Sequence, residues 1–142
     1  MNNTPQVKAP WLKSKDPEVP AALTYSELSM CSRVEEMVRR YPDYIAYEFM
    51  GKCTTYAEMW KKINACAKSL KAIGIREGDK VTICMPNAPQ TLCMFYAVNM
   101  VGAIANMVHP LSAESEIAFY LRDSGSVAAI TLDQFYNKFE SV

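Results

Sequence analysis

Few residues in this 142-residue chain could carry acid–base, nucleophilic or metal-dependent chemistry: one histidine, five cysteines and some scattered aspartates. His109 follows an apolar run and has no acid paired with it nearby, so it is a poor basis for a catalytic triad. No G-x-S-x-G sequence supplies a nucleophile. His109 either lines a ligand pocket at the end of a strand or belongs to a turn that Pro110 fixes, and we favour the turn. For Asn87 we likewise favour a turn-capping amide over a pocket residue.

The cysteines do not have the spacing of a metal site or of a disulfide framework. The five cysteines are Cys31, Cys53, Cys66, Cys84 and Cys93. No two of them form a C-x-x-C pair, their number is odd, and four of the five lie in apolar runs. Buried free thiols in a reducing compartment explain this pattern best. We therefore expect a cytoplasmic protein and predict no metal-binding residue.

The acidic residues and glycines do not form a recognisable phosphate site either. Four aspartates fall at expected turns or helix ends, where a carboxylate accepts backbone hydrogen bonds: Asp43, Asp79, Asp123 and Asp133. The five glycines give neither G-x-G-x-x-G nor G-x-x-x-x-G-K-[ST]. We therefore assign no catalytic, cofactor-binding or metal-binding residue to this chain, and no cofactor.

The charge balance excludes one large class of function. Fifteen basic and fifteen acidic residues are interspersed and give a net charge of zero. Proteins bind nucleic-acid backbones by neutralising phosphates, so we expect no nucleic-acid partner. Half of the residues are apolar, which is enough for the core of one domain or a substantial piece of one. The first eight residues lack the apolar stretch of a secretory signal.

The first 23 residues are predicted to form an extended arm. Half of the prolines fall within the first twenty residues, at Pro5, Pro10, Pro17 and Pro20. That spacing prevents a helix and disfavours a strand. We expect Trp11 and Leu12 to fix the arm to a surface, which belongs either to this chain or to a partner outside it.

Residues 24–142 are predicted to form an α/β subdomain that begins with a helix and a hairpin. Apolar residues from Met30 to Tyr41 have helical spacing, and Pro42 ends the helix. Residues 44–56 contain two β-prone runs around Met50-Gly51-Lys52, which is typical of a hairpin. Thr55 and Glu58 have the spacing of a capping box for the next helix. The apolar stripe of that helix comprises Tyr56, Trp60, Ile63, Ala67 and Leu70, and Gly74 closes it.

Strands and helices alternate after Gly78. We expect strands at 80–85, 103–108 and 126–132, with helices at 88–101, at 112–124 and from 133 onward. Ser112 is expected to cap the second helix, and Asp133 or Thr131 the third. This order predicts a mostly parallel sheet with helices on both faces, built from strands that are apolar throughout. The helix at 88–101 is apolar nearly all round, so it must be covered on several sides.

Residues 91–108 have the length of a membrane span, but their composition argues against one. Asn99, Gly102 and Asn106 interrupt the apolar run, and unpaired amides are costly inside hydrocarbon. A buried helix followed by a buried strand explains the same residues without that cost.

Four short motifs occur in a characteristic order. They are T-Y-A-E-M at Thr55–Met59, G-I-R-E-G-D-K-V with a later P-N step at Gly74–Gln90, V-G-A through H-P-L at 101–111, and L-R-D-S-G at 121–125. Together they resemble the N-terminal part of the AMP-forming acyl-CoA synthetases of the adenylate-forming superfamily. The early P-W-L-K-S at Pro10–Ser14 is similar to the arm of bacterial long-chain fatty acid–CoA ligases. One departure is H-P-L-S-A-E-S-E-I at 109–117, where family members often read N-P-L-Y-T-x-x-E-L.

The resemblance implies part of the large N-terminal domain of a ligase of lipid metabolism. In such a parent enzyme ATP and Mg²⁺ convert a fatty acid to an acyl-adenylate, and the CoA thiol then displaces AMP. The family's phosphate-binding loop, its adenine and ribose segments and its C-terminal lysine all come later than the residues matched here. We therefore expect this chain alone to be inactive. Its implied partners are the remainder of the parent chain and, for the parent, fatty acid and CoA.

A stand-alone, non-catalytic α/β interaction module is the alternative. A phospho-acceptor receiver domain is disfavoured, because no expected strand end offers an acidic pair. A Ser/Thr/Gly-rich loop with lysine encoded beyond Val142 would favour the ligase. We further expect exposed apolar surface to cause self-association of this chain. Peripheral membrane contact is an expectation for the parent only, since no basic amphipathic segment here provides it.

Overall fold

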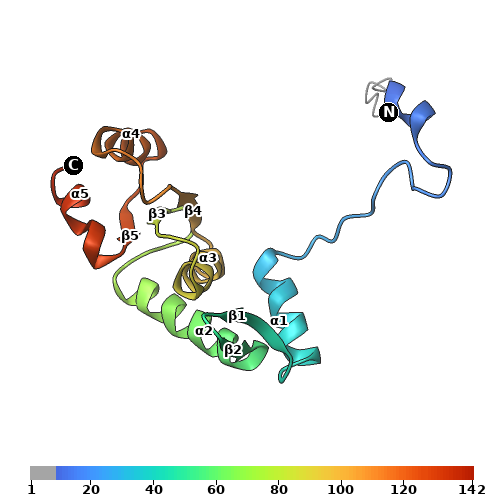
Figure 1. The fold of residues 1–142 in the computed structure, drawn as a ribbon, viewed down its shortest axis with the longest axis horizontal. Coiled ribbons are helices and arrows are strands. Elements are labelled where there is room, and N and C mark those ends of the chain that lie inside the picture. The colour runs from blue at the N-terminus through green and yellow to red at the C-terminus, as the bar shows by residue number, and fades with distance from the viewer. Residues whose placement is uncertain (1–8) are drawn as a thin grey trace.

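The computed structural model describes residues 9–142, and Figure 1 shows an α/β body from which an N-terminal arm extends. The body contains helices on both faces of a parallel sheet, together with a separate hairpin, so the predicted fold class is confirmed. Its helices are α1 (Met30–Arg40), α2 (Tyr56–Ala72), α3 (Pro89–Val101), α4 (Glu114–Ser124) and α5 (Tyr136–Glu140). Its strands are β1 (Ile45–Phe49), β2 (Lys52–Thr55), β3 (Lys80–Cys84), β4 (Ile104–Met107) and β5 (Ala128–Thr131).

The arm differs from the prediction in one segment. Pro10–Ser14 forms a 3-10 helix, η1, where an extended chain was expected. Proline is compatible with the first helical position, because the N–H group that it lacks has no partner there in any helix. Residues 20–29 contain no helix or strand. The first eight residues of the expected arm lie outside the described residues.

The helix and hairpin that precede the sheet agree with the prediction except at one residue. Ser29 caps α1 by accepting a hydrogen bond from the Ser32 backbone N–H. Met30, expected on the buried face, is exposed, and Cys31 is the buried residue of this helix. The hairpin turns at Met50 and Gly51, whose φ angles of 50° and 77° are both positive. Two positive φ angles match the twist of the paired strands, which explains the tight antiparallel pairing of β1 and β2.

The capping box of α2 is confirmed. The Glu58 backbone N–H donates to Thr55 Oγ1 at 3.2 Å, and the Thr55 backbone N–H donates to Glu58 Oε2 at 3.0 Å. Along the predicted apolar stripe, Ile63, Ala67 and Leu70 are buried. This helix packs on α3, and the two helices together cover one face of the sheet (Figure 1).

The sheet has three parallel strands in the order β4-β3-β5. Its central strand is buried from Val81 onward, and its residues alternate between the two faces. Val81 and Ile83 pack in the core with α2 and α3, whereas Cys84 packs with α4. The prediction of strands covered on both faces is wrong for the two edge strands. Ile104 and Met107 of β4 are more than half exposed, because no further strand or helix among residues 9–142 covers them.

The predicted start and caps of the last two helices differ from those in the structure. The N-cap of α4 is Ala113, one residue after the expected Ser112, and the Glu116 carboxylate accepts its backbone N–H at 2.9 Å. The last helix is divided into a 3-10 turn, η2 (Asp133–Phe135), and α5. Neither expected residue caps it: Asp133 bonds only the next backbone N–H, and Thr131 Oγ1 donates to the Cys84 carbonyl.

Residues 91–108 form most of α3 and all of β4, so the predicted helix followed by a strand is confirmed. The strand was expected to be buried, and this part of the prediction is wrong, because β4 lies at the edge of the sheet. α3 contributes Cys93, Ala97, Val98 and Val101 to the core. Across residues 9–142, no helix is long and apolar enough to cross a bilayer.

Candidate functional site

The carboxyl ends of the parallel strands border a hollow of about 490 Å³. Open α/β sheets bind ligands at this edge, because loops from several strands converge there. The hollow has an apolar floor and three polar lining side chains. The complete lining is Met85, Pro86, Asn87, Met107, Val108, His109, Pro110, Leu111, Gln134 and Phe135. None of these residues is an acid, a lysine or an arginine.

His109 combines features of both interpretations made from the sequence. It is exposed, and its Nδ1 accepts the backbone N–H of Leu111 at 3.2 Å, which is the local role of a turn residue. Because Nδ1 accepts, a neutral imidazole carries its proton on Nε2. The same side chain lines the hollow, so the favoured turn interpretation is incomplete.

Asn87 lines the hollow as well, and the turn-capping role that we favoured for it is not observed. No side-chain hydrogen bond of Asn87 occurs among residues 9–142. Its loop is held instead by Thr91, whose Oγ1 donates to the Pro86 carbonyl at 2.6 Å. Sequence analysis missed this contact. The available signal was a threonine in the first turn of a helix that begins with proline.

Lys138 is the second feature that sequence analysis missed. Its Nζ donates to the Ser112 carbonyl at 2.9 Å and approaches the Pro110 carbonyl at 3.5 Å. The ammonium also lies 5.7 Å from the centre of the Phe135 ring. Lys138 therefore joins α5 to the loop after β4. Because its ammonium donates to backbone carbonyls, Lys138 stabilises this loop and is not positioned to bind an anionic ligand.

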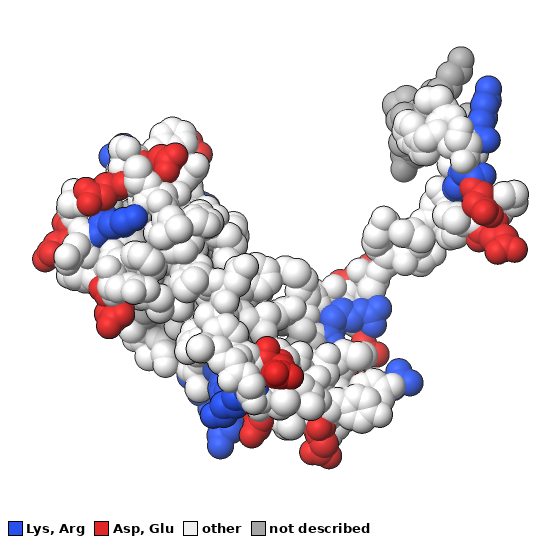
Figure 2. All heavy atoms as spheres, viewed as in Figure 1, with Lys and Arg blue, Asp and Glu red and all other residues white. Residues whose placement is uncertain are grey.

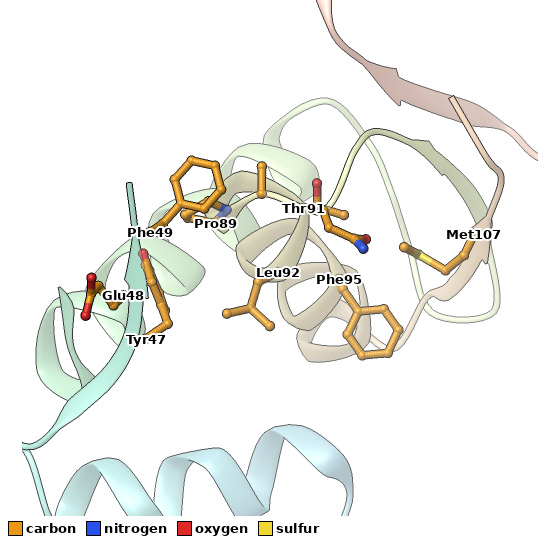
Figure 3. Close-up of a pocket in the computed structure, with 10 residues that line it drawn as sticks. Tyr47, Glu48, Phe49, Pro89, Thr91, Leu92, Phe95 and Met107 are labelled. Atoms are coloured by element: carbon orange, nitrogen blue, oxygen red, sulfur yellow. The ribbon is translucent and has the colours of Figure 1, made fainter. Parts of the chain in front are cut away.

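A second cavity, an apolar groove of about 370 Å³, lies between the hairpin and α3 (Figure 3). Tyr47 and Phe49 come from β1, Leu92 and Phe95 from α3, and Met107 from β4. Glu48 is the only charged residue in the lining, and Asn87 and Met107 are shared with the hollow. A groove of this size and polarity can accept an apolar group but offers no acid–base pair.

The pKa shifts in the body arise from burial and from helix capping. All five cysteines are free, as predicted, but the prediction that they are buried is wrong for Cys53, which is exposed in the hairpin. Burial raises the pKa of the thiols of Cys31, Cys66, Cys84 and Cys93, so these thiols stay protonated at neutral pH. The backbone N–H of Thr55 lowers the pKa of the Glu58 carboxyl, which is the effect expected of a helix cap.

The aspartates partly behave as predicted. Asp79 Oδ2 accepts the Arg76 backbone N–H at 2.7 Å, and Asp133 Oδ1 accepts the Gln134 backbone N–H at 2.8 Å. Asp43 and Asp123 take part in no side-chain hydrogen bond among the described residues. No group of three His, Cys, Asp or Glu side chains in residues 9–142 is arranged to hold a metal ion.

The model of the AMP-binding enzyme family matches residues 34–141. Among curated proteins, a long-chain-fatty-acid–CoA ligase from Bacillus subtilis is 32% identical over 133 residues. The match covers 94% of this chain and 24% of that ligase. The long-chain-fatty-acid–CoA ligase FadD13 of Mycobacterium tuberculosis is 42% identical over 76 residues, which make up 54% of this chain and 15% of that protein. The chain thus spans about a quarter or less of the curated relatives that it matches.

Solved structures agree with these matches. The inhibitor-bound N-terminal domain of FACL13 from Mycobacterium tuberculosis has a TM-score of 0.74 at 31% identity, over 78% of this chain and 28% of that one. The N-terminal subdomain of NpsA from Klebsiella oxytoca, in complex with 3-hydroxybenzoyl-AMSN, has a TM-score of 0.70 at 26% identity. That match covers 72% of this chain and 26% of that one.

Proposed function

Because this chain belongs to the AMP-binding enzyme family, we propose that it is the first part of an ATP-dependent, AMP-forming long-chain fatty acid–CoA ligase. One observation carries the proposal. Nearly the whole chain, 94% of it, aligns with a long-chain-fatty-acid–CoA ligase of which it covers only 24%. A ligase from Salmonella typhimurium gives the same proportions, 96% of this chain and 25% of the relative.

The proposed activity of the complete enzyme has two steps. The carboxylate of a fatty acid attacks the α-phosphorus of ATP, giving an acyl-adenylate and pyrophosphate. The thiol of CoA then attacks the acyl carbon, giving an acyl-CoA and AMP. Such an enzyme acts in lipid metabolism and uses ATP, Mg²⁺ and CoA.

The residues described here fit neither the metal nor the triphosphate. A magnesium site needs carboxylate or other oxygen ligands, and residues 9–142 hold no acidic cluster at the sheet edge. Triphosphate binding needs cations or a cradle of backbone N–H groups. The hollow has no cationic lining residue, and the nearby Lys138 donates to two carbonyls. On the face in Figure 2, acidic and basic side chains are interspersed rather than gathered at a site.

The role that we propose for this chain is therefore that of a framework. The three parallel strands hold the loops at Asn87 and His109 at one edge, and α2 and α3 supply the core beneath them. The apolar groove beside α3 provides a surface on which later parts of the ligase pack or an acyl chain lies. We propose that the chain alone catalyses neither step.

Pyrophosphate exchange into ATP tests this function, with palmitate as the acid. The chain of 142 residues should give no exchange above a protein-free blank, and the longer product of the same gene should give palmitate-dependent exchange and palmitoyl-CoA. Exchange by the 142-residue chain would refute its inactivity. A longer product that folds but forms no acyl-CoA would refute the ligase assignment and favour the interaction module.

Three further properties are part of the proposal. The apolar groove and the edge of β4 are exposed, so the chain should self-associate, with sedimentation coefficients that rise with concentration. Five free cysteines suit a reducing compartment, so we place the protein in the cytoplasm, which cell fractionation would check. Peripheral membrane contact is proposed for the complete enzyme only, and binding of that enzyme to lipid vesicles would test it.

A further inference from the structure

The arm has no partner on the body that the structure describes. η1 buries none of its residues, and Trp11 is 64% exposed. Leu23 at the end of the arm is 62% exposed, and Tyr25 in the segment that joins the arm to α1 is 80% exposed. Figure 1 shows that the arm leaves the body at α1 and is directed away from the sheet and the hairpin.

The composition of η1 suits docking better than exposure to water. A single 3-10 turn is marginal by itself, because few hydrogen bonds offset the loss of chain entropy. Exposed apolar side chains grouped on such a short element mark a contact surface. Trp11 and Leu12 provide the apolar part, Lys13 follows them directly, and Lys15 comes two residues later. The complementary surface is therefore an apolar depression with acidic side chains beside it.

The relatives that match this chain extend well beyond the matched part. The family model begins at residue 34, so the arm lies outside the domain that the family shares. The alignments with the Bacillus subtilis and Salmonella typhimurium ligases cover 94% and 96% of this chain, which is impossible without much of the arm. A relative that shares the arm is thus about four times as long as this chain.

We propose that the arm docks through Trp11 and Leu12 on the part of the ligase that follows residue 142. This inference rests on the proposed function, because it needs a longer chain. The arm then joins the first residues of the enzyme to a region far along the sequence, and so fixes the framework domain to it. A second copy of this chain is the competing partner, since Glu48 at the apolar groove could face the arm's lysines.

Cleavage after Lys13 by trypsin reports docking directly, because Lys13 is exposed and follows the anchor residues. We would treat the 142-residue chain and the longer gene product with trypsin, and follow the product that starts at Ser14 by mass spectrometry. Cleavage depends on the population of the undocked arm. We expect cleavage after Lys13 to be at least ten times slower in the longer protein than in the 142-residue chain.

Two variants separate docking from general protection. The double substitution Trp11→Ala and Leu12→Ala should restore fast cleavage in the longer protein. Met50→Ala is the matched control, because Met50 is 91% exposed at the hairpin turn and lies outside the arm. It should leave the protection unchanged. All three proteins should retain ligation, which shows that they are folded.

Each other outcome is decisive. Equal cleavage rates in the two wild-type proteins would overturn the proposal, as would protection that survives the double substitution. Protection in the 142-residue chain that increases with protein concentration would identify a second copy as the partner. A longer protein that protects Lys13 but forms no acyl-CoA would refute the proposed function and leave the docking intact.

Discussion

A buried cluster of hydrogen-bonded side chains ties the parallel sheet to the end of α4, and replacing Thr82 tests its contribution to stability. Thr82 is fully buried at the middle of β3. Its Oγ1 accepts from Asn106 Nδ2 of β4 at 2.9 Å and shares a hydrogen bond of 2.8 Å with Ser126 Oγ. Ser124 Oγ closes the cluster at 2.8 Å from Ser126 and 3.2 Å from Asn106.

Thr82→Val keeps the shape of the side chain and removes both hydrogen bonds. Each hydrogen bond contributes roughly 0.5–1.5 kcal/mol, so their loss should cost about 1–3 kcal/mol. The added methyl group is favourable by up to about 0.8 kcal/mol. With the full methyl contribution subtracted, we expect a net loss of about 0.2–2.2 kcal/mol in the free energy of unfolding, with a central value near 1 kcal/mol.

Thr54→Val is the matched control. Thr54 is 3% exposed, but its hydroxyl takes part in no side-chain hydrogen bond among residues 9–142. Its replacement should change stability by less than about 0.5 kcal/mol. Both variants would be measured by urea unfolding, with circular dichroism and tryptophan fluorescence required to give coincident transitions.

A double-mutant cycle with Ser126→Ala then measures the interaction energy between the Thr82 and Ser126 hydroxyls. Removing both hydroxyls leaves no unpaired partner at their shared hydrogen bond, so the double variant should lose about 0.5–1 kcal/mol less than the sum of the single variants. Additive losses would refute the reasoning. A Thr82→Val variant as stable as Thr54→Val would refute it as well.

Three smaller predictions follow from other features. The pKa of the Glu58 carboxyl is lower in the folded state than its ordinary value of 4.5. The ionised carboxylate therefore stabilises the fold above pH 4.5, and this stabilisation is lost as the pH falls through the folded-state pKa. Glu58→Gln should reduce the pH dependence of the unfolding midpoint in that acidic range. Gly102→Ala should destabilise the protein more than Gly74→Ala, by several tenths of a kcal/mol in urea unfolding. Both glycines have positive φ, but only the added Cβ at Gly102 would meet Glu77, at 3.0 Å. Cys53 is the exposed thiol, so a disulfide reagent at pH 8 should show a fast phase that Cys53→Ser removes.

Local sequence signals predicted the elements of the fold well. Thr55 and Glu58 lie three residues apart and satisfy each other's backbone groups, so their box needs no tertiary information. Gly51 and Gly125 likewise mark turns where a positive φ is required. The order and spacing of four short motifs sufficed to identify the family, because each motif includes an end of a helix or strand that the fold fixes.

The contacts between distant residues could not be predicted in the same way. Thr82 and Ser126 are 44 positions apart, and Lys138 and Pro110 are 28 apart. Nothing in the composition of either segment identifies its partner. The cap of α4 was misplaced by one residue for a related reason. Serine at 112 is the better cap by propensity, but the Glu116 carboxylate reaches the backbone of Ala113.

The strand β3 shows how an apparently apolar run can carry two different faces. The sequence Val81-Thr82-Ile83-Cys84 was interpreted as apolar throughout, because threonine and cysteine are compatible with a buried strand. In the sheet, Val81 and Ile83 pack with α2 and α3, whereas the Thr82 hydroxyl meets Asn106. A pairing shift of one residue would bury that hydroxyl in the apolar layer without a partner. The polar cluster therefore specifies the register of the sheet, and with it the positions of the loops that carry Asn87 and His109.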